Sequence, residues 1–161
     1  MAENKLNNSE ANVLLQLISF ELEEEQFGID IYMVQEIIRM VPITKIPNSP
    51  DFVEGVINIR GRIIPVVNLR SRMGMPEKVH DNNSRIIVVE VNKQTTGFIV
   101  DAVNEVLRVP VNITEEPPEI VTGVNSEYIK SVGKLEDRIL ILIDFERVLS
   151  KSEQLELQTI N

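Results

Sequence analysis

The stretch that decides the fold is FVEGVINIRGRIIPVVNL, residues 52–69. It predicts a β-hairpin, because two apolar runs flank the dipeptide Arg60-Gly61, which is typical of a tight turn. The alternation of apolar and polar residues fails over Ile63–Val67, so this strand is expected to be covered on both faces. Pro65 has no backbone N–H to donate, and it therefore marks a sheet edge or a bulge.

Upstream of this hairpin the sequence predicts two more strands and a helical turn. Apolar and polar residues alternate over residues 18–31, with the period of two that half-buried strands show. The acidic run Glu23–Gln26 within them predicts a solvated hairpin connection, and a metal site is the alternative interpretation. The residues Val34, Ile37 and Ile38 fall at spacings of three and four, which favours one face of a helical turn.

Downstream of the hairpin the same pattern begins again. One register places Gly97 under Gly28, and a second, displaced by a few residues, places residues 138–140 under residues 62–64. The chain is therefore interpreted as an internal duplication with a period of about seventy residues. The second copy carries a short insertion at residues 115–125.

The duplication predicts the fold class. Two copies of a short, strongly β unit can hide their sheet edges only by closing into small barrels or by packing on each other. We therefore expect an all-β protein made of two small β-barrels in contact, with short helical turns. The doubly apolar runs Ile63–Val67 and Ile139–Ile143 should lie where the barrels meet. Apolar residues among charged ones from Phe145 onward predict an amphipathic C-terminal helix.

The domain boundaries follow from the same pattern. Residues 1–12 are expected to form a flexible N-terminal tail. One duplicated domain should span residues 13–150, made of two intertwined subdomains that divide at approximately 13–80 and 81–150. Residues 151–161 are expected to form a C-terminal helical tail.

Composition and charge exclude several classes of protein. The chain has 161 residues, of which 43% are hydrophobic and 25% charged, values near the globular average. A net charge of -9 and only five Phe, two Tyr and no Trp argue against an oligonucleotide-binding barrel, which needs a basic groove with stacking aromatics. Residues 1–12 are polar, and no apolar run approaches the roughly 20 residues of a membrane span. The sequence therefore predicts a cytoplasmic protein that inserts no segment into a membrane.

Little in the sequence points to catalysis. There is no cysteine, which removes disulfides and thiolate metal sites. The single histidine, His80, lies in the linker Gly74–Ser84 and is interpreted as an exposed linker residue; no P-loop or dinucleotide-binding glycine pattern is present. The remaining acid–base candidates near expected strand ends are Asp30, Glu36, Asp101 and Glu105. We expect a protein that is not an enzyme and that holds no cofactor or metal.

The candidate functional residues are of the kind that bind other proteins. Arg60 sits at the hairpin tip, where it is either an interface anchor or a solvated turn residue. Gly55 either starts the turn or marks a place where a larger side chain would block a docking surface. Val34, Val103 and Val106 are interpreted as lying on helical turns, where they either belong to the core or line a groove that an apolar partner helix could occupy.

Residues 52–70 are similar to the signature of the CheW family, the coupling proteins of bacterial chemotaxis. Residues 27–37, 97–101 and 137–142 resemble other blocks of that family in the same order. The resemblance covers roughly Leu14–Leu149. It departs mildly from the family signature, which commonly has leucine and aspartate where this chain has Ile59 and Asn68.

The resemblance implies a fold, partners and site residues. The fold would be two small five-stranded barrels, each SH3-like. The protein would be a non-enzymatic adaptor, recruited to receptor arrays at the membrane, that joins transmembrane chemoreceptors to the histidine kinase CheA. The cytoplasmic hairpin tip of the receptor would dock between the barrels against Arg60, with Val34, Glu36 and Gly55 at neighbouring family positions. The regulatory domain of the kinase would pack on the end of a barrel.

Two relatives carry this domain beside other domains, namely the kinase itself and a coupling protein fused to a phospho-receiver domain. A chain of 161 residues has no room for either addition, so the stand-alone adaptor is expected. The rival interpretation is a paralogue that completes signalling rings without engaging receptors, and the presence of Arg60 and Gly55 favours the receptor-competent form.

Overall fold

The structure is a computed structural model, and it describes residues 13–115 and 128–148. The expected tails and nearly all of the expected insertion lie outside these residues. The elements, in chain order, are β1 (Leu14–Leu22), β2 (Glu25–Asp30), the 3₁₀ turn η1 (Ile31–Met33), β3 (Val34–Arg39), β4 (Val53–Ile59), β5 (Arg62–Asn68), α2 (Leu69–Arg72), β6 (Arg85–Val91), β7 (Gln94–Val100), β8 (Ala102–Pro110), η2 (Val111–Ile113), β9 (Thr114–Glu115), β10 (Ile129–Lys134), β11 (Ile139–Ile143) and α3 (Phe145–Val148). No helix in the described ranges is long and apolar enough to span a membrane.

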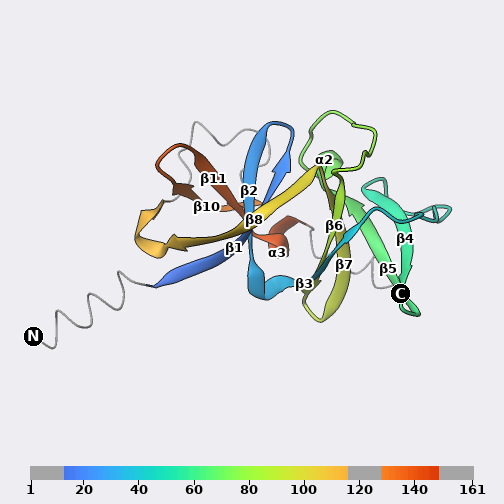
Figure 1. Cartoon of the computed structure of the whole chain (residues 1–161). Helices are drawn as coiled ribbons and strands as arrows, with labels where there is room; N and C mark the ends of the chain where they lie inside the picture. Colours follow the sequence, from blue (N-terminus) through green and yellow to red (C-terminus); the bar gives the residue numbers. More distant parts are fainter. Residues whose placement is uncertain (1–12, 116–127, 149–161) are drawn as a thin grey trace, which may run out of the picture.

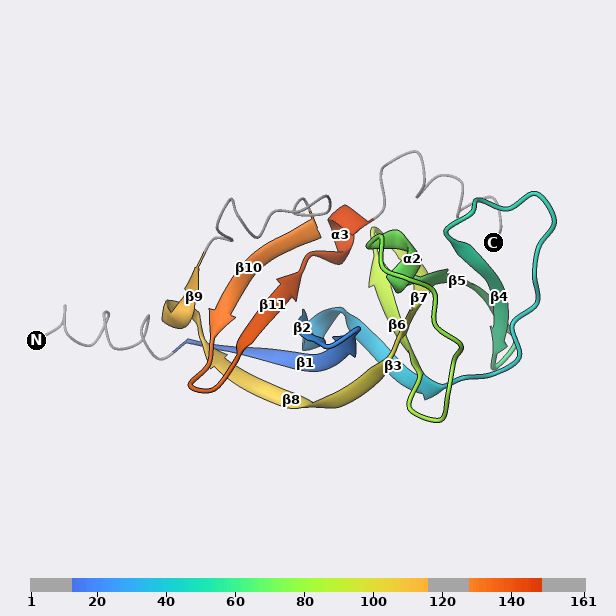
Figure 2. The same cartoon turned by 90° about the horizontal axis from the view of Figure 1, so that it is seen from above.

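The strands form two sheets that lie side by side (Figures 1 and 2). The first unit is a six-stranded sheet in the order β8-β1-β2-β11-β10-β9, and the second unit is a five-stranded sheet in the order β3-β6-β7-β5-β4. The sixth strand of the first unit, β9, has only two residues. The prediction of an all-β fold built from two small units is confirmed.

Each unit takes strands from both halves of the chain. The hairpin β1–β2 pairs with β8 on one side and, in parallel, with β11 on the other. The hairpin β6–β7 pairs in the same way with β3 and, in parallel, with β5. The two hairpins are therefore exchanged between the repeats. The described parts of residues 13–80 and 81–150 therefore each contribute strands to both sheets.

The strand registers confirm the duplication. Val34 of β3 stands opposite Val89, and Val103 of β8 stands opposite Phe20 at the corresponding place in the first unit. Each strand has a β-bulge directly after that valine. The parallel pairs obey the second register, because β7 meets β5 at Gly97 and Val66 while β2 meets β11 at Gly28 and Leu142.

The helical turn expected around Val34 is wrong, because Val34–Arg39 is strand β3. Its residues alternate in burial, and the only helical residues nearby are those of η1. The misleading spacing came from Ile37, an apolar residue on the outer face of the strand with 36% of its surface exposed. The same correction applies to Val103 and Val106, which lie on strand β8.

The two units share the largest hydrophobic cluster of the described residues. Phe20 and Phe27 of the first unit stack at 5.7 Å between ring centroids, and Phe98 of the second unit meets Phe145 of α3 edge-on at 4.8 Å. A ring centroid distance of 6.3 Å between Phe20 and Phe145 joins the two pairs. Burial of side chains from both units in one cluster makes the units depend on each other for stability.

The doubly apolar strands explain how each unit has its own core as well. In β5, Ile64 and Val66 face the core of the second unit while Val67 belongs to the shared cluster. In β11, Leu140 and Leu142 face the core of the first unit while Ile143 belongs to the shared cluster. The prediction that these runs lie where the units meet therefore holds for one face of each strand.

Buried charges at α2 add a polar connection between the units. The Nε of Arg70 lies 3.0 Å from Oδ1 of Asp101, and its Nη2 lies 2.5 Å from Oε1 of Glu23 on the β1–β2 turn. The backbone N–H of Glu23 donates to Asp101 Oδ2 at 2.9 Å. Side-chain exposure is only 9% for Arg70 and 10% for Asp101, so each charge depends on its partner.

Arg72, two residues further along, joins α2 to α3. Its guanidinium lies over the rings of Phe52 and Tyr128, at 5.7 and 5.6 Å from their centroids. Its Nε also donates to the backbone carbonyl of Val148 at 2.7 Å. Helix α3 begins at Phe145 as the sequence predicts, and its expected continuation lies outside the described residues.

Candidate functional site

The tip of the β4–β5 hairpin presents an arginine on a constrained backbone. Ile59 pairs with Arg62, so the loop between the strands is only Arg60 and Gly61. Both loop residues have positive φ angles, 50° and 84°. The Asn58 side chain oxygen Oδ1 accepts a hydrogen bond from the Gly61 N–H at 2.9 Å. The Arg60 side chain projects from this turn with 76% of its surface exposed.

Arg60 forms an ion pair with Glu36 on β3. Because β3 and β4 are the two edge strands of the five-stranded sheet, this pair joins opposite edges of the second unit. An exposed pair of this kind adds little stability, and it places the guanidinium beside the Glu36 carboxylate. Two residues that the resemblance assigns to receptor binding, Arg60 and Glu36, are therefore in contact.

Val34 lies on the same strand as Glu36 but serves the core. It is partly buried and packs against the shared cluster, as does Val103 at the equivalent place in the first unit. Val106 differs, because it lies on β8 with 56% of its surface exposed. Of the three valines, Val106 is the one whose side chain is available to a partner.

Gly55 does not start a turn, because it is buried within β4. A Cβ added there would lie 2.4 Å from the backbone oxygen of Thr44 and 2.7 Å from Cγ2 of Ile43. Thr44 and the neighbouring Val56 exchange two backbone hydrogen bonds of 2.9 and 2.8 Å. Glycine is needed at this position because the loop before β4 passes too close for any side chain.

Two matching hollows lie at equivalent places in the repeat, and the sequence did not predict them. The hollow of the first unit measures about 740 Å³ and is lined by Glu24, Glu25, Gln26, Lys134, Leu135, Asp137, Arg138 and Ile139. The hollow of the second unit measures about 640 Å³ and is lined by Arg62, Ile63, Ile64, Asn92, Lys93, Gln94 and Thr95. Each is formed by the tip of the exchanged hairpin and the start of the strand that runs parallel to it.

Both hollows combine exposed apolar side chains with buried polar atoms that lack a hydrogen bond. Ile139 and Ile63, the equivalent isoleucines at the two strand starts, have 61% and 49% of their surface exposed. Within the described ranges, the buried side-chain atoms that lack a hydrogen-bond partner are Gln26 Oε1, Gln94 Nε2 and Arg138 Nε. All three belong to residues that line a hollow. Buried polar atoms without a hydrogen bond are costly, so a partner that bonded to them would gain affinity.

The charges of the two hollows differ. The charged residues lining the hollow of the second unit are Arg62 and Lys93. The hollow of the first unit has three acidic residues and two basic ones. The sequence places Ile63 and Ile139 at equivalent positions of the repeat, but the pattern of apolar residues did not indicate that these two side chains are exposed.

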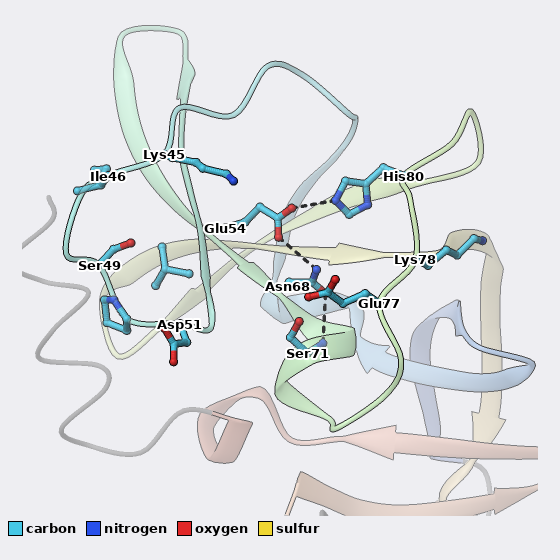
Figure 3. A pocket seen from close by; sticks show the side chains of 12 residues that line it. Lys45, Ile46, Ser49, Asp51, Glu54, Asn68, Ser71, Glu77, Lys78 and His80 are labelled. Atoms are coloured by element: carbon cyan, nitrogen blue, oxygen red, sulfur yellow. Dashed lines mark hydrogen bonds and ion pairs between the residues drawn. The ribbon is translucent and has the colours of Figure 1, made fainter.

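A third cavity, of about 460 Å³, lies beside β4 and is drawn in Figure 3. Its centre is the carboxylate of Glu54, which lies 3.1 Å from Nε2 of His80 and accepts a hydrogen bond of 3.1 Å from Nδ2 of Asn68. His80 is therefore not a freely exposed linker residue, because only 29% of its side chain is accessible. The lining includes the cationic Lys45 and Lys78 and the anionic Asp51, Glu54 and Glu77, so the cavity has no single charge preference.

One turn of the linker shows a perturbed carboxyl group. The backbone N–H of Asn83 donates to Asp81 at 2.8 Å and holds the pKa of this carboxyl below its usual value. Among the residues that the structure describes, no three His, Cys, Asp or Glu side chains are grouped to hold a metal ion.

Three comparisons with known proteins all match this chain to the same family. A family model described as "CheW-like domain" matches residues 16–153. A "Chemotaxis protein CheW" of Klebsiella aerogenes is 37% identical over 138 residues, which are 86% of this chain and 83% of that protein. One of Thermotoga maritima is 34% identical over 139 residues, 84% of this chain and 88% of that protein. A crystal structure of the scaffolding protein TtCheW from Thermoanaerobacter tengcongensis superposes with a TM-score of 0.80 at 39% identity, covering 88% of this chain and 91% of that one.

Proposed function

Because the chain belongs to the CheW-like domain family, we propose that it is the adaptor that couples transmembrane chemoreceptors to the histidine kinase CheA in bacterial chemotaxis. The observation that carries the proposal is the match of the family model to nearly the whole of the described chain. The family is one of scaffolding proteins, so the protein is expected to act by binding. We expect the protein to be held at receptor arrays through its binding to the receptors and the kinase.

We assign receptor binding to the tip of the second unit. Arg60 is exposed on a rigid two-residue turn and oriented by Glu36, and a fixed arginine is a typical interface anchor. Gly55 and Val34 support this tip from within, because Gly55 lets the preceding loop bridge to β4 and Val34 packs the strand that carries Glu36. The exposed Val106 is the apolar candidate contributed by the first unit, and Val103 on the same strand packs against the shared cluster.

We assign kinase binding to the two hollows. The resemblance implies that the regulatory domain of the kinase, itself built like this chain, packs on barrel ends. The hollows offer exposed isoleucines and unpaired buried polar atoms, as an interface with an apolar core and a polar rim requires. The basic lining of one hollow and the mixed lining of the other give each a distinct partner surface.

The receptor assignment is tested by Arg60→Glu. Charge reversal of an anchor should weaken binding to a soluble cytoplasmic receptor fragment by about thirtyfold, roughly 2 kcal/mol. Binding to the kinase and the melting temperature should stay as they are, because an exposed turn side chain has little to lose. The matched control is Arg147→Glu, since Arg147 is also exposed (66%) and paired with a carboxylate, that of Asp144.

The outcomes separate the alternatives. Loss of receptor binding, kinase binding and stability together would make Arg60 structural. Retention of all three would make Arg60 an ordinary solvated turn residue. A wild-type protein that binds the kinase but no receptor fragment would be a paralogue that completes rings without engaging receptors. The opposite variant, Ile63→Asp, should lose kinase binding while keeping the receptor. Purified protein should also raise kinase autophosphorylation in the presence of receptor, and kinase output that is indifferent to it would contradict the adaptor role.

A further inference from the structure

The turn that carries Arg60 has an unfavourable residue in it. A two-residue hairpin loop with positive φ at both positions is a type I′ turn, which strongly prefers asparagine or glycine. Gly61 fits this requirement, but Arg60 holds a φ of 50°, where a long side chain is strained. Strain of this kind persists only where the surroundings enforce it, and it is typical of functional sites.

The equivalent hairpin in the first unit lacks this backbone. Leu135 and Arg138 close its tip with a hydrogen bond of 2.9 Å from the Leu135 N–H, so Glu136 and Asp137 occupy the places of Arg60 and Gly61. Neither of these two residues has a positive φ angle. The fold therefore accepts an ordinary backbone at this point of the repeat, and the left-handed turn at Arg60 is a property of one unit only.

The side chain that contacts this turn is that of Asn58. Its Oδ1 accepts the Gly61 N–H at 2.9 Å, a side-chain contact that substitutes for a backbone turn contact. Asn58 is exposed, so this hydrogen bond serves no core packing. Lys134 stands at the equivalent place in the first unit, and a lysine side chain cannot accept a hydrogen bond.

We propose that Asn58 is a positioning residue, which holds the hairpin tip in the left-handed conformation that presents Arg60 to the receptor. Asn58 fixes the backbone of the turn, while Glu36 fixes the guanidinium from the opposite edge of the sheet. Without the side-chain acceptor, the strained turn gives way to other conformations, and only the fraction that remains correctly turned binds. The inference rests on the proposed receptor-binding role of Arg60.

The test compares Asn58→Ala with Asn58→Asp. Asn58→Ala removes the acceptor and should weaken binding to the receptor fragment roughly tenfold, whereas Asn58→Asp keeps an acceptor oxygen and should bind within about twofold of wild type. Kinase affinity should not change in either variant. The amide of Gly61 should exchange with solvent faster in Asn58→Ala and not in Asn58→Asp. Asn83→Ala is the matched control, an exposed asparagine in a turn of the linker.

A double-mutant cycle decides whether Asn58 acts through Arg60. Adding Asn58→Ala to Arg60→Ala should cost no further receptor affinity, because the presented side chain is already gone. The inference is overturned if the cost is the same in both backgrounds, if Asn58→Ala binds receptor like wild type, or if kinase binding falls in parallel. If Arg60→Glu itself leaves receptor binding intact, the proposed site fails; if only Asn58→Ala has no effect, the positioning role alone fails.

Discussion

Gly55→Ala is the substitution whose outcome the structure determines most directly. The new Cβ would meet the backbone oxygen of Thr44 at 2.4 Å and the backbone carbon of Thr44 at 2.9 Å. Both are backbone atoms, so the clash cannot be relieved by turning a side chain. The loop before β4 must move away, and the reciprocal hydrogen bonds of 2.9 and 2.8 Å between Thr44 and Val56 must open.

The expected cost follows from these contacts. Two backbone hydrogen bonds contribute about 2 kcal/mol together, and a φ of 154° at residue 55 adds backbone strain of about 1 kcal/mol for any residue with a Cβ. The free energy of unfolding should therefore fall by about 3 kcal/mol. For a chain of this size the melting temperature should fall by roughly 6–12 °C.

Thermal and urea unfolding, followed by circular dichroism, measure this directly. The control is Gly61→Ala, because a Cβ at Gly61 has no atom within 4 Å but still meets a φ of 84°. Its cost should be only about 1 kcal/mol, the backbone contribution alone. If Gly55→Ala melts like wild type while losing receptor affinity, Gly55 is a docking position and the close-approach argument is wrong.

Three further outcomes are expected. Thermal unfolding should give one calorimetric transition, because the units share a core cluster and exchange hairpins; two resolved transitions would contradict this. Arg70→Met should lower the free energy of unfolding by about 3 kcal/mol, because it leaves the Asp101 carboxylate buried without its partner. Urea unfolding measures this loss, and an unchanged midpoint would show that the pair is dispensable. The depressed pKa of Asp81 means that its turn is stabilised above the usual carboxyl pKa of 3.8 and weakens as the pH falls through the lower folded value; an NMR titration of the Asn83 amide should follow this, and a flat titration in that range would refute it.

The sequence was sufficient for the fold class and the duplication, because both depend on the period of the apolar residues. It was not sufficient for the pairing of the strands. Alternation indicates which face of a strand is buried and not which strand lies beside it, so the exchange of the β1–β2 and β6–β7 hairpins left no signal. The error at β3 has a similar cause, since one apolar residue on the outer face, Ile37, produced helical spacing in a strand.

The candidate site was predictable only in part. A hairpin tip at Arg60 follows from the Arg-Gly dipeptide between two apolar runs. The contact of Arg60 with Glu36 could not be predicted, because it depends on how the two edges of the sheet approach each other in the fold. Nothing in the sequence distinguishes a glycine beside a passing loop from a glycine beneath a partner, so the role of Gly55 came from its distance to Thr44. The hollows could be recognised only from the structure, which shows that Ile63 and Ile139 are exposed.

The exchange of hairpins also changes what a single cut would do. Hydrolysis of the peptide bond after Val79, in the exposed linker between α2 and β6, would leave an N-terminal piece that lacks β6 and β7 and a C-terminal piece that lacks β1 and β2. Neither piece could complete a sheet alone, yet mixed together they hold every strand of both. The two pieces are therefore expected to fold only when they are mixed, as the fragments of a split protein do. Because each sheet is built from strands of both repeats, deletion of either repeat would leave both sheets incomplete.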